Sequence, residues 1–599
     1  TNDNNTAIGH DAMKENTSGG GNTAVGNMSL SYNTTGSANS AFGKEALGSN
    51  TSGMRNTAVG YYAIRAVTTG SNNTAIGKDA LMTNQTGNNN TALGYRTLEL
   101  STAHNNTAVG YKALLKNTTG SGTAVGFQAL SGNTTGVGNS AFGFDALQAN
   151  TSGSNNHAFG NYALLHNTTG DGNVAMGIYS LKSNTTGEFN ISIGGNSLGD
   201  NNGSYNVSVG TAALEKNTSG NHSIGIGHFA LNKNTTASRN IAIGSHALEN
   251  NTGTENTALG YHALASNTVA NQNTAIGAYS LYSNVNGDNN IAIGHDALRN
   301  NSSGNRNVAL GYHALRSNTT AQYNTATGDR TLKDNTTGQY NTANGSSALE
   351  ANQDGNNNTA NGSFALSKNS SGSNNTATGH DALRDNSSGS ENTAVGYDAL
   401  KLSTTANSNT AVGKSVLMHV VTGQYNTATG AHSLENTTGG LNTALGYGAG
   451  DALTSGTKNV YIGHDAEASA GNVQNEVAIG QGVTGAGSNT VSIGNTNITA
   501  IKGQVAFSTY SDERIKRNIN DSKLGLDFIM KLRPVTYKMK NPADYPNELL
   551  EARFRDVPGN GPFVGEVERP ADDENTYDGL IAQEVKEAMG QFAKDFFDP

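Results

Sequence analysis

Ser511 and Lys516, five residues apart, form the pair in this sequence that is best suited to covalent chemistry. A serine hydroxyl becomes a nucleophile when a base removes its proton, and a lysine amine can be that base once burial or a nearby cation lowers its pKa. Arg514 and Arg517 could lower that pKa or stabilise an oxyanion. The pair could therefore form a serine–lysine hydrolytic centre, but the spacing alone favours the simpler interpretation, in which Ser511 caps a helix and Lys516 is a solvated surface residue.

The composition gives little support to other classes of site. The chain has no cysteine, and its net charge of −10 comes without basic blocks, which argues against nucleic acid as the main partner. No apolar run approaches the roughly 20 residues of a membrane span, so we expect no membrane insertion. Four histidines follow repeat glycines without metal-ligand spacing, so we expect surface residues, no metal and no other cofactor. They are His10, His228, His262 and His295.

A pentapeptide of the type N-T-A-V-G recurs along the chain. Its final glycine occurs 30 times between residues 9 and 494, and of the 29 spacings 23 are 17 residues, five are 16 and the last is 14. A hydrophobic content of 34% is low enough to suggest a disordered chain. Disordered low-complexity sequence does not keep such a regular period, however, so the period argues against disorder. The period predicts units that each pack on their neighbours.

The repeat reads N-T-A-[VIL]-G-x-x-A-L-x-x-N-T-[TS]-G-x-x. Its first five positions favour a short strand, and the small third residue indicates tight packing. The Ala-Leu pair adds a second apolar face, and N-T-T-G predicts a turn in which Asn bonds to nearby backbone. The triplets N-T-T and N-T-S also match glycosylation acceptors. The glycines that end the strands are predicted turn residues, among them Gly9, Gly26, Gly43, Gly60, Gly244 and Gly480.

These features predict a mainly β chain in which residues 1–494 form a parallel β-solenoid or β-roll of about 30 repeats. Coils stacked at about 4.8 Å would make a rod of roughly 140 Å. One coil buries little, and the apolar content is thin for a lone rod. We therefore expect a homotrimer in which three parallel rods share an axis and hide their sheet edges.

The hydrophobic fourth position of the motif becomes polar at five places in the second half of the rod. Polar side chains there would weaken a core unless they form ladders or meet water or an axial ion, and stacked Asn and Thr are the simpler interpretation. The five residues are Thr327, Asn344, Asn361, Thr378 and Thr429.

The composition changes near residue 508. All seven prolines lie at or beyond Pro534, and charged residues number 51 in the first 507 positions but 31 in the last 92. Residues 495–507 leave the repeat and predict short strands that close the solenoid. Residues 508–599 predict a small α+β domain that we expect to continue beyond Pro599. Its expected elements are a helix at Leu524–Leu532, a strand at Val535–Lys540, an insertion at Asn541–Thr576, and a second strand that leads into a helix over Leu580–Met589.

The strand motif resembles the head repeats of trimeric autotransporter adhesins, whose motif is of the type S-V-A-I-G-x-x-A. The nearest matches are Asn190–Gly194 (NISIG), Val207–Gly210 (VSVG) and Val477–Gly480 (VAIG). The resemblance covers about residues 5–494 and implies a left-handed parallel β-roll that trimerises. The 17-residue period is longer than that family usually shows.

Two strings beyond the rod, Ser511–Ile519 (SDERIKRNI) and Gly579–Val585 (GLIAQEV), resemble the peptidase S74 domain. This is the intramolecular chaperone at the C-terminus of phage tail fibres and tailspikes, and the resemblance covers about residues 508–590. It implies a domain that trimerises the fibre, directs its folding and then cuts itself off. By this resemblance Ser511 is the nucleophile, Lys516 is the general base and Tyr510–Ser511 is the scissile bond.

Together these features predict a homotrimeric phage tail fibre, located in the virion, whose rod spaces or presents a surface for a host receptor, expected to be a glycan. A region upstream of this sequence would join it to other virion or tail proteins. A bacterial trimeric surface adhesin that retains an S74-type trimerisation module, located at the cell surface, is the alternative. A glycan depolymerase ranks lower, because the 28 acidic residues of the first 507 show no evident pair.

Overall fold

The computed structural model describes residues 3–502, 532–537 and 577–580. The chain divides into two units, Thr1–Thr499 and Ala500–Pro599. The first unit contains one parallel sheet with one short strand in each coil. Its strands are β1 Thr6–Ile8, β2 Thr23–Val25, β3 Ser40–Phe42, β4 Thr57–Val59, β5 Thr74–Ile76, β6 Thr91–Leu93, β7 Thr107–Val109, β8 Gly122–Val125, β9 Asn139–Phe142, β10 His157–Phe159, β11 Val174–Met176, β12 Ile191–Ile193, β13 Val207–Val209, β14 Ile224–Ile226, β15 Ile241–Ile243, β16 Thr257–Leu259, β17 Thr274–Ile276, β18 Ile291–Ile293, β19 Val308–Leu310, β20 Thr325–Thr327, β21 Thr342–Asn344, β22 Thr359–Asn361, β23 Thr376–Thr378, β24 Thr393–Val395, β25 Thr410–Val412, β26 Thr427–Thr429, β27 Thr443–Leu445, β28 Val460–Ile462, β29 Val477–Ile479 and β30 Val491–Ile493.

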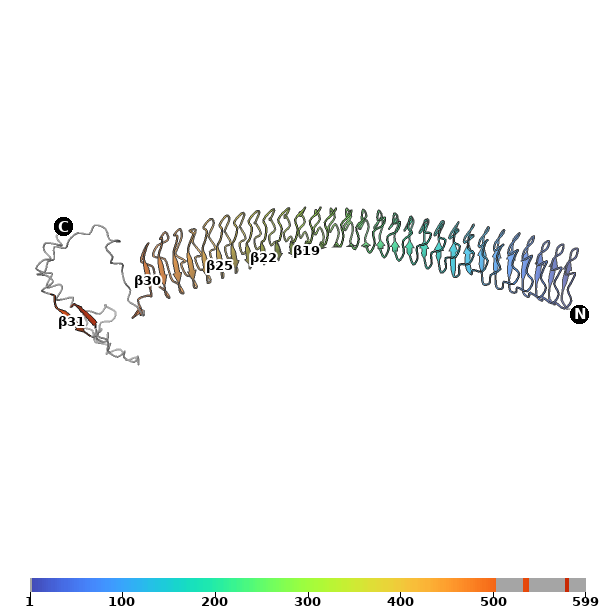
Figure 1. Cartoon of the computed structure of the whole chain (residues 1–599), viewed down its shortest axis with the longest axis horizontal. Coiled ribbons are helices and arrows are strands. Elements are labelled where there is room, and N and C mark those ends of the chain that lie inside the picture. Colours follow the sequence, from blue (N-terminus) through green and yellow to red (C-terminus); the bar gives the residue numbers. More distant parts are fainter. Residues whose placement is uncertain (1–2, 503–531, 538–576, 581–599) are drawn as a thin grey trace. The chain divides into compact units, whose positions relative to one another are not determined.

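The coils stack in sequence order and form a gently curved solenoid, with the strands aligned along one side (Figure 1). Each strand pairs in parallel with the strand of the next coil, and equivalent repeat residues face each other, as in Ala41↔Ala58 and Phe42↔Val59. The predicted parallel β-solenoid with one coil per 17 residues is confirmed. Within the described residues there is no helix long and apolar enough to cross a bilayer.

The core of a coil comes from three small or aliphatic side chains, and the Ala-Leu pair that was expected to form a second apolar face lies inside the coil. In the coil of β7, Ala108 lies at the centre of the strand, Ala113 and Leu114 form the Ala-Leu pair, and all three are fully buried. Leu114 adopts a left-handed conformation with φ of 50°, and Lys112 does the same with φ of 58°. The Lys112 N–H donates to the carbonyl of Tyr95 in the preceding coil at 3.0 Å. The Leu114 N–H donates to the carbonyl of Ala129 in the next coil at 3.0 Å.

Two columns of buried asparagine run through the interior. Asn56, just before β4, donates from Nδ2 to the Gly70 carbonyl at 2.9 Å and accepts the Asn73 N–H at 3.0 Å on Oδ1. In the turn column, Nδ2 of Asn50 donates to Oδ1 of Asn33 at 2.7 Å and to the Gly53 carbonyl at 3.0 Å. These amides link neighbouring coils by hydrogen bonds. The turn column is interrupted where Val67 follows Asn50, and Oδ1 of Asn50 has no partner among the described residues. Asn50 heads an N-T-S triplet and is fully buried, so a glycan there would break the ladder.

The C-terminal end of the solenoid uses different residues. Glu476 stands where the column before the strands otherwise has mostly asparagine; it is fully buried, and its carboxylate accepts the Tyr461 hydroxyl at 3.0 Å and the Gly487 N–H at 2.8 Å. Burial beside this carboxylate raises the pKa of Tyr461. Beyond β30, residues 495–502 contain a turn and no strand, so the predicted closing strands are wrong over this range. The side-chain amide of Asn495 instead donates to the Gln481 carbonyl at 2.7 Å, so this carbonyl of the last full coil has a hydrogen-bond partner.

In the second unit, β31 (Pro534–Tyr537) pairs antiparallel with β32 (Tyr577–Leu580). The strand predicted from Val535 is confirmed over Val535–Tyr537. Leu580 was predicted to open a helix, but it is the last residue of β32, because it pairs with Pro534. Of the helix predicted over Leu524–Leu532, Leu532 is described and is not helical. Residues 524–531, the insertion and the rest of the second helix lie outside the described residues.

Candidate functional site

The glycine that ends each strand has a fixed geometric role. Gly244 has φ of 136°, and a Cβ added to it would lie 2.4 Å from the carbonyl oxygen of Gly260 in the next coil. An L-residue is excluded both by the backbone conformation and by the close approach of the coils. The same φ range, 131° to 137°, is found at Gly9, Gly26, Gly43, Gly60 and Gly480.

The first and third residues of each strand form an outer face of the sheet, which faces away from the coil interior. In β15, Ile241 and Ile243 are each 36% exposed, while Ala242 between them is fully buried. The fourth motif position therefore lies outside the core of its own coil, contrary to the expectation that polar residues there would weaken that core. The alternation of a strand explains this, since the small third motif residue takes the interior.

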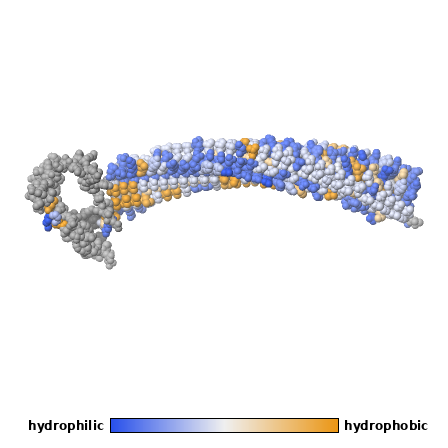
Figure 2. Space-filling model, viewed as in Figure 1, coloured by the Kyte–Doolittle hydropathy of each residue, from blue (hydrophilic) through white to orange (hydrophobic). Residues whose placement is uncertain are grey.

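The polar residues of the fourth motif position lie on this outer face. Asn344 in β21 donates from Nδ2 to Oδ1 of Asn361 in β22 at 2.9 Å, so the predicted stacking of asparagines is confirmed for this pair. Figure 2 shows apolar residues gathered on the strand side of the solenoid, most clearly over its last coils. Leu445 and Ile493 belong to this face and are 52% and 43% exposed.

Aromatic residues directly after several repeat glycines form a second surface column. The rings of Tyr111, Phe127 and Phe144 stack with centroid separations of 4.9 and 4.8 Å and interplanar angles of 9° and 4°. Their faces are covered by one another. Because sugars stack on ring faces, this geometry indicates a ladder that stabilises the coils more than a platform for glycans.

Histidines also occupy a neighbouring column, formed by the second residue after the repeat glycine. His246 and His262 stack at 4.7 Å, and burial together with the His246 charge lowers the pKa of His262. His295 was predicted to lack ligand partners, but it lies with Asp296 and His313 in a group that could hold a metal ion. Spacing within one coil could not reveal this, because His313 comes from the next coil. A search at the repeat offset would have found it.

That group already holds cations around its buried carboxylate. Oδ2 of Asp296 lies 3.4 Å from Nε2 of His313 and 3.3 Å from Nη1 of Arg299. Burial and the Arg316 cation lower the pKa of His313. A metal ion would have to compete with two guanidinium groups, so the local charge disfavours it.

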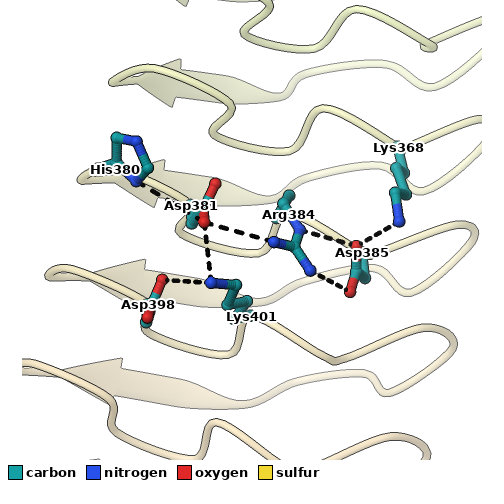
Figure 3. A network of polar contacts seen from close by, with 7 residues as sticks. All are labelled: Lys368, His380, Asp381, Arg384, Asp385, Asp398 and Lys401. Carbon is teal, nitrogen blue, oxygen red and sulfur yellow. Dashed lines mark hydrogen bonds and ion pairs between the residues drawn. The ribbon is translucent and has the colours of Figure 1, made fainter.

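A network of charged side chains links three neighbouring coils, those of β22, β23 and β24 (Figure 3). Nζ of Lys401 lies 2.9 Å from Oδ2 of Asp381 and 3.0 Å from Oδ1 of Asp398. His380 completes a second potential metal-binding group with these two carboxylates. Since both carboxylates already bind the same ammonium, the arrangement favours an ion-pair network that fastens the coils together.

Asp385 is the most strongly stabilised anion of this network. Its carboxylate accepts two hydrogen bonds from Arg384 at 2.9 Å, and Nζ of Lys368 lies 2.8 Å from Oδ1. The Arg384 hydrogen bonds, with Lys368, lower the pKa of Asp385 from 3.8 to about 2.

We expect the stability that Asp385 provides to depend on pH below pH 4. Because the pKa is lower in the folded than in the unfolded state, the contribution is present above pH 4 and disappears as pH falls through about 2. The shift corresponds to roughly 2 kcal/mol, and screening by solvent at this partly exposed carboxylate reduces the contribution to about 1–2 kcal/mol. The difference in unfolding midpoint between pH 5 and pH 2.5 should be smaller in Asp385→Asn than in the wild type. It should be unchanged in Asp354→Asn, which alters an exposed turn; an equal effect of both variants would contradict the prediction.

The residues predicted to carry the covalent chemistry, Tyr510, Ser511 and Lys516, lie outside the described residues. Among the described residues of this unit, the β31–β32 pair joins the segments on either side of the predicted insertion.

Comparison with protein families identifies the C-terminal unit. The family model Peptidase_S74, described as chaperone of endosialidase, matches residues 511–594 and so includes both Ser511 and Lys516. No curated protein matches the chain. A long parallel β-solenoid with coils of about 17 residues is thus followed, in this chain, by a C-terminal Peptidase_S74 chaperone-of-endosialidase domain.

Proposed function

We propose that this protein is a homotrimeric tail fibre of a phage, located in the virion, whose solenoid spaces or presents a surface that binds a host receptor. The outer face of the sheet carries the proposal. It exposes aliphatic side chains along most of the solenoid, as at Ile76, Ile243 and Ile293, and the chain itself provides nothing to cover them among the described residues. Together with a C-terminal chaperone domain, this face supports three parallel copies around one axis.

A second copy fits this face better than an unrelated globular partner does. The side chains repeat at the strand spacing of about 4.8 Å, and another solenoid offers the same period over the same length. Covering the face would also remove from water the apolar residues that a single chain leaves exposed.

The mass of the assembled particle tests the proposal. Native mass spectrometry of the full chain should give three copies, and electron microscopy should show a rod of about 140 Å. A monomeric mass at micromolar concentration, with the solenoid folded, would exclude the trimer.

The C-terminal domain is proposed to act once, on its own chain. Oγ of Ser511 attacks the carbonyl carbon of Tyr510, its hydroxyl proton passes to Lys516, and an ester forms as the Ser511 amide nitrogen leaves as an amine that takes a proton from Lys516. Water then hydrolyses the ester. The products are a rod that ends in the Tyr510 carboxylate and a fragment that begins with Ser511.

The alternative is a bacterial trimeric surface adhesin, supported by the likeness of NISIG and VAIG strands to adhesin head repeats. The sequence upstream of this chain distinguishes the two. A virion-attachment domain would support the fibre, and a secretory signal would support the adhesin.

A further inference from the structure

The regularity of the outer face creates a problem for any assembly of identical copies. In 25 of the strands β1–β30 the third residue is apolar, so one copy could slide along another by whole coils and still bury similar surface. When one copy slides by one coil, buried apolar surface is lost only at the two ends, where a coil is left without a partner. A trimer with one structure therefore needs a feature that marks position along the rod.

Strands β20–β23 form such a feature, which we name the polar block. Their third residues are Thr327, Asn344, Asn361 and Thr378, and their first residues are all threonine. Leu310 in β19 and Val395 in β24 border the block on either side. Four adjacent coils thus carry no aliphatic side chain on the outer face, and elsewhere in β1–β30 the third residue is polar only at Thr429.

The chain's own fold does not require this block. Ala326, Ala343, Ala360 and Ala377 remain fully buried at the strand centres, and the strands pair in the same register as elsewhere. The coil interior is therefore the same with a polar or an apolar residue outside. The polar residues therefore affect the contact between the outer face and the molecule that covers it.

The block also keeps hydrogen-bonding capacity free for that contact. Among the described residues, the hydrogen bond from Asn344 to Asn361 uses one amide donor and one acceptor oxygen. Each primary amide has two N–H donors and an oxygen with two lone pairs, so both asparagines can form further hydrogen bonds with neighbouring copies.

We propose that the polar block sets the register of the trimer, by meeting the same block of the two other copies. This inference rests on the proposed trimer. In register, polar residues meet polar residues at one level of the axis. A slip of one coil places Leu310 beside Thr327 and Thr378 beside Val395. A slip of four coils toward the N-terminus places every member of the block against an aliphatic side chain of β16–β19. The same slip toward the C-terminus does so for all members except Asn361, which meets Thr429. Polar groups buried without partners are unfavourable, and a polar position within an apolar seam is an established way to specify register.

A single spin label per chain tests the register directly. The chain has no cysteine, so Val269→Cys, at an exposed turn position, provides one labelling site. All chains carry Ser511→Ala, so that they keep the same C-terminal domain, and are unfolded in guanidinium chloride and refolded by dilution. A symmetric trimer in register gives one label-to-label distance by pulsed dipolar spectroscopy, and each coil of offset displaces a label by about 4.8 Å along the axis.

The decisive variant replaces the block by valine, the residue at the neighbouring Val395: Thr327→Val, Asn344→Val, Asn361→Val and Thr378→Val. We expect trimers with several label distances in place of one. The matched control makes four changes on the same face that keep it apolar, Val109→Ile, Val125→Ile, Val395→Ile and Val412→Ile, and should retain the single distance. The milder pair Asn344→Val and Asn361→Val serves if the fourfold variant does not fold.

The outcomes separate the two proposals. A trimer of the block variant with the single wild-type distance would overturn the register inference and leave the trimer intact. A monomeric wild type would overturn the trimer and the inference that rests on it. Several distances in the control as well would also overturn the inference, because an apolar change would then disturb register as much as loss of the block.

Discussion

Ser511→Ala should leave every chain at full length, whereas the assembled wild type should yield two fragments. The proposed cleavage needs the Ser511 oxygen as nucleophile, and alanine has no group to replace it. Lys516→Ala should have the same effect, because the hydroxyl proton then has no base. We expect the rate of cleavage to fall by at least about 10³-fold in both variants. Intact mass spectrometry of the refolded chain gives the readout, with a new N-terminus at Ser511 in the wild type.

Nearby residues of the same types provide the controls. Ser508→Ala and Lys523→Ala should be cleaved like the wild type. All variants should assemble to the same oligomer, which shows that the chaperone part still folds. If Ser511→Ala gives the same two fragments, the assignment of the nucleophile is wrong. If the wild type stays intact after assembly, the domain acts here as a chaperone without protease activity.

Gly244→Val should interrupt the solenoid. A valine Cβ would lie 2.4 Å from the Gly260 carbonyl oxygen, at a φ of 136° that a β-branched residue does not adopt. Neither coil can move away without breaking the parallel hydrogen bonds between β15 and β16. We expect a loss of about 4 kcal/mol or more in local stability and new proteolysis between these coils.

Gly195→Val is the matched control for this prediction. Gly195 is a turn glycine of the same solenoid, but its added Cβ would lie 3.6 Å from a side-chain carbon of Ile178, an ordinary contact. Limited proteolysis followed by peptide mapping should find cuts near residue 244 only in Gly244→Val. Equal resistance of the two variants would show that the coils can separate locally at little cost.

The sequence alone predicted the period, the strand and its inward residue. Glycine at the end of each strand and a small residue two places earlier recur too regularly for disorder, and such a period requires neighbouring coils to make the same contacts. The Ala-Leu pair was recognised as apolar but expected to form a second face, whereas Ala113 and Leu114 lie in the coil interior. The S74 domain was recognisable because its two motifs, Ser511–Ile519 and Gly579–Val585, are specific to that family.

Three features depend on the stacking of the coils and were not predicted from the sequence. Leucine at φ near 50°, as at Leu114, has no local signal, because the conformation is adopted to hydrogen-bond the next coil. The asparagine columns looked like turn chemistry, and only the 17-residue offset turns them into ladders such as Asn50 to Asn33. The group of His295 with His313 likewise depends on adjacent coils.

The orientation of the fourth motif position shows most clearly what the tertiary structure added. Its valine, isoleucine or leucine was assigned to the core from hydrophobicity, but a strand of three residues has room inside for one side chain, and the small residue takes it. Composition determines that a residue avoids water; the coil determines which side it faces. Because the interior was already filled by alanine, leucine and hydrogen-bonded asparagine, the larger aliphatic residues were left outside, where a second copy can cover them.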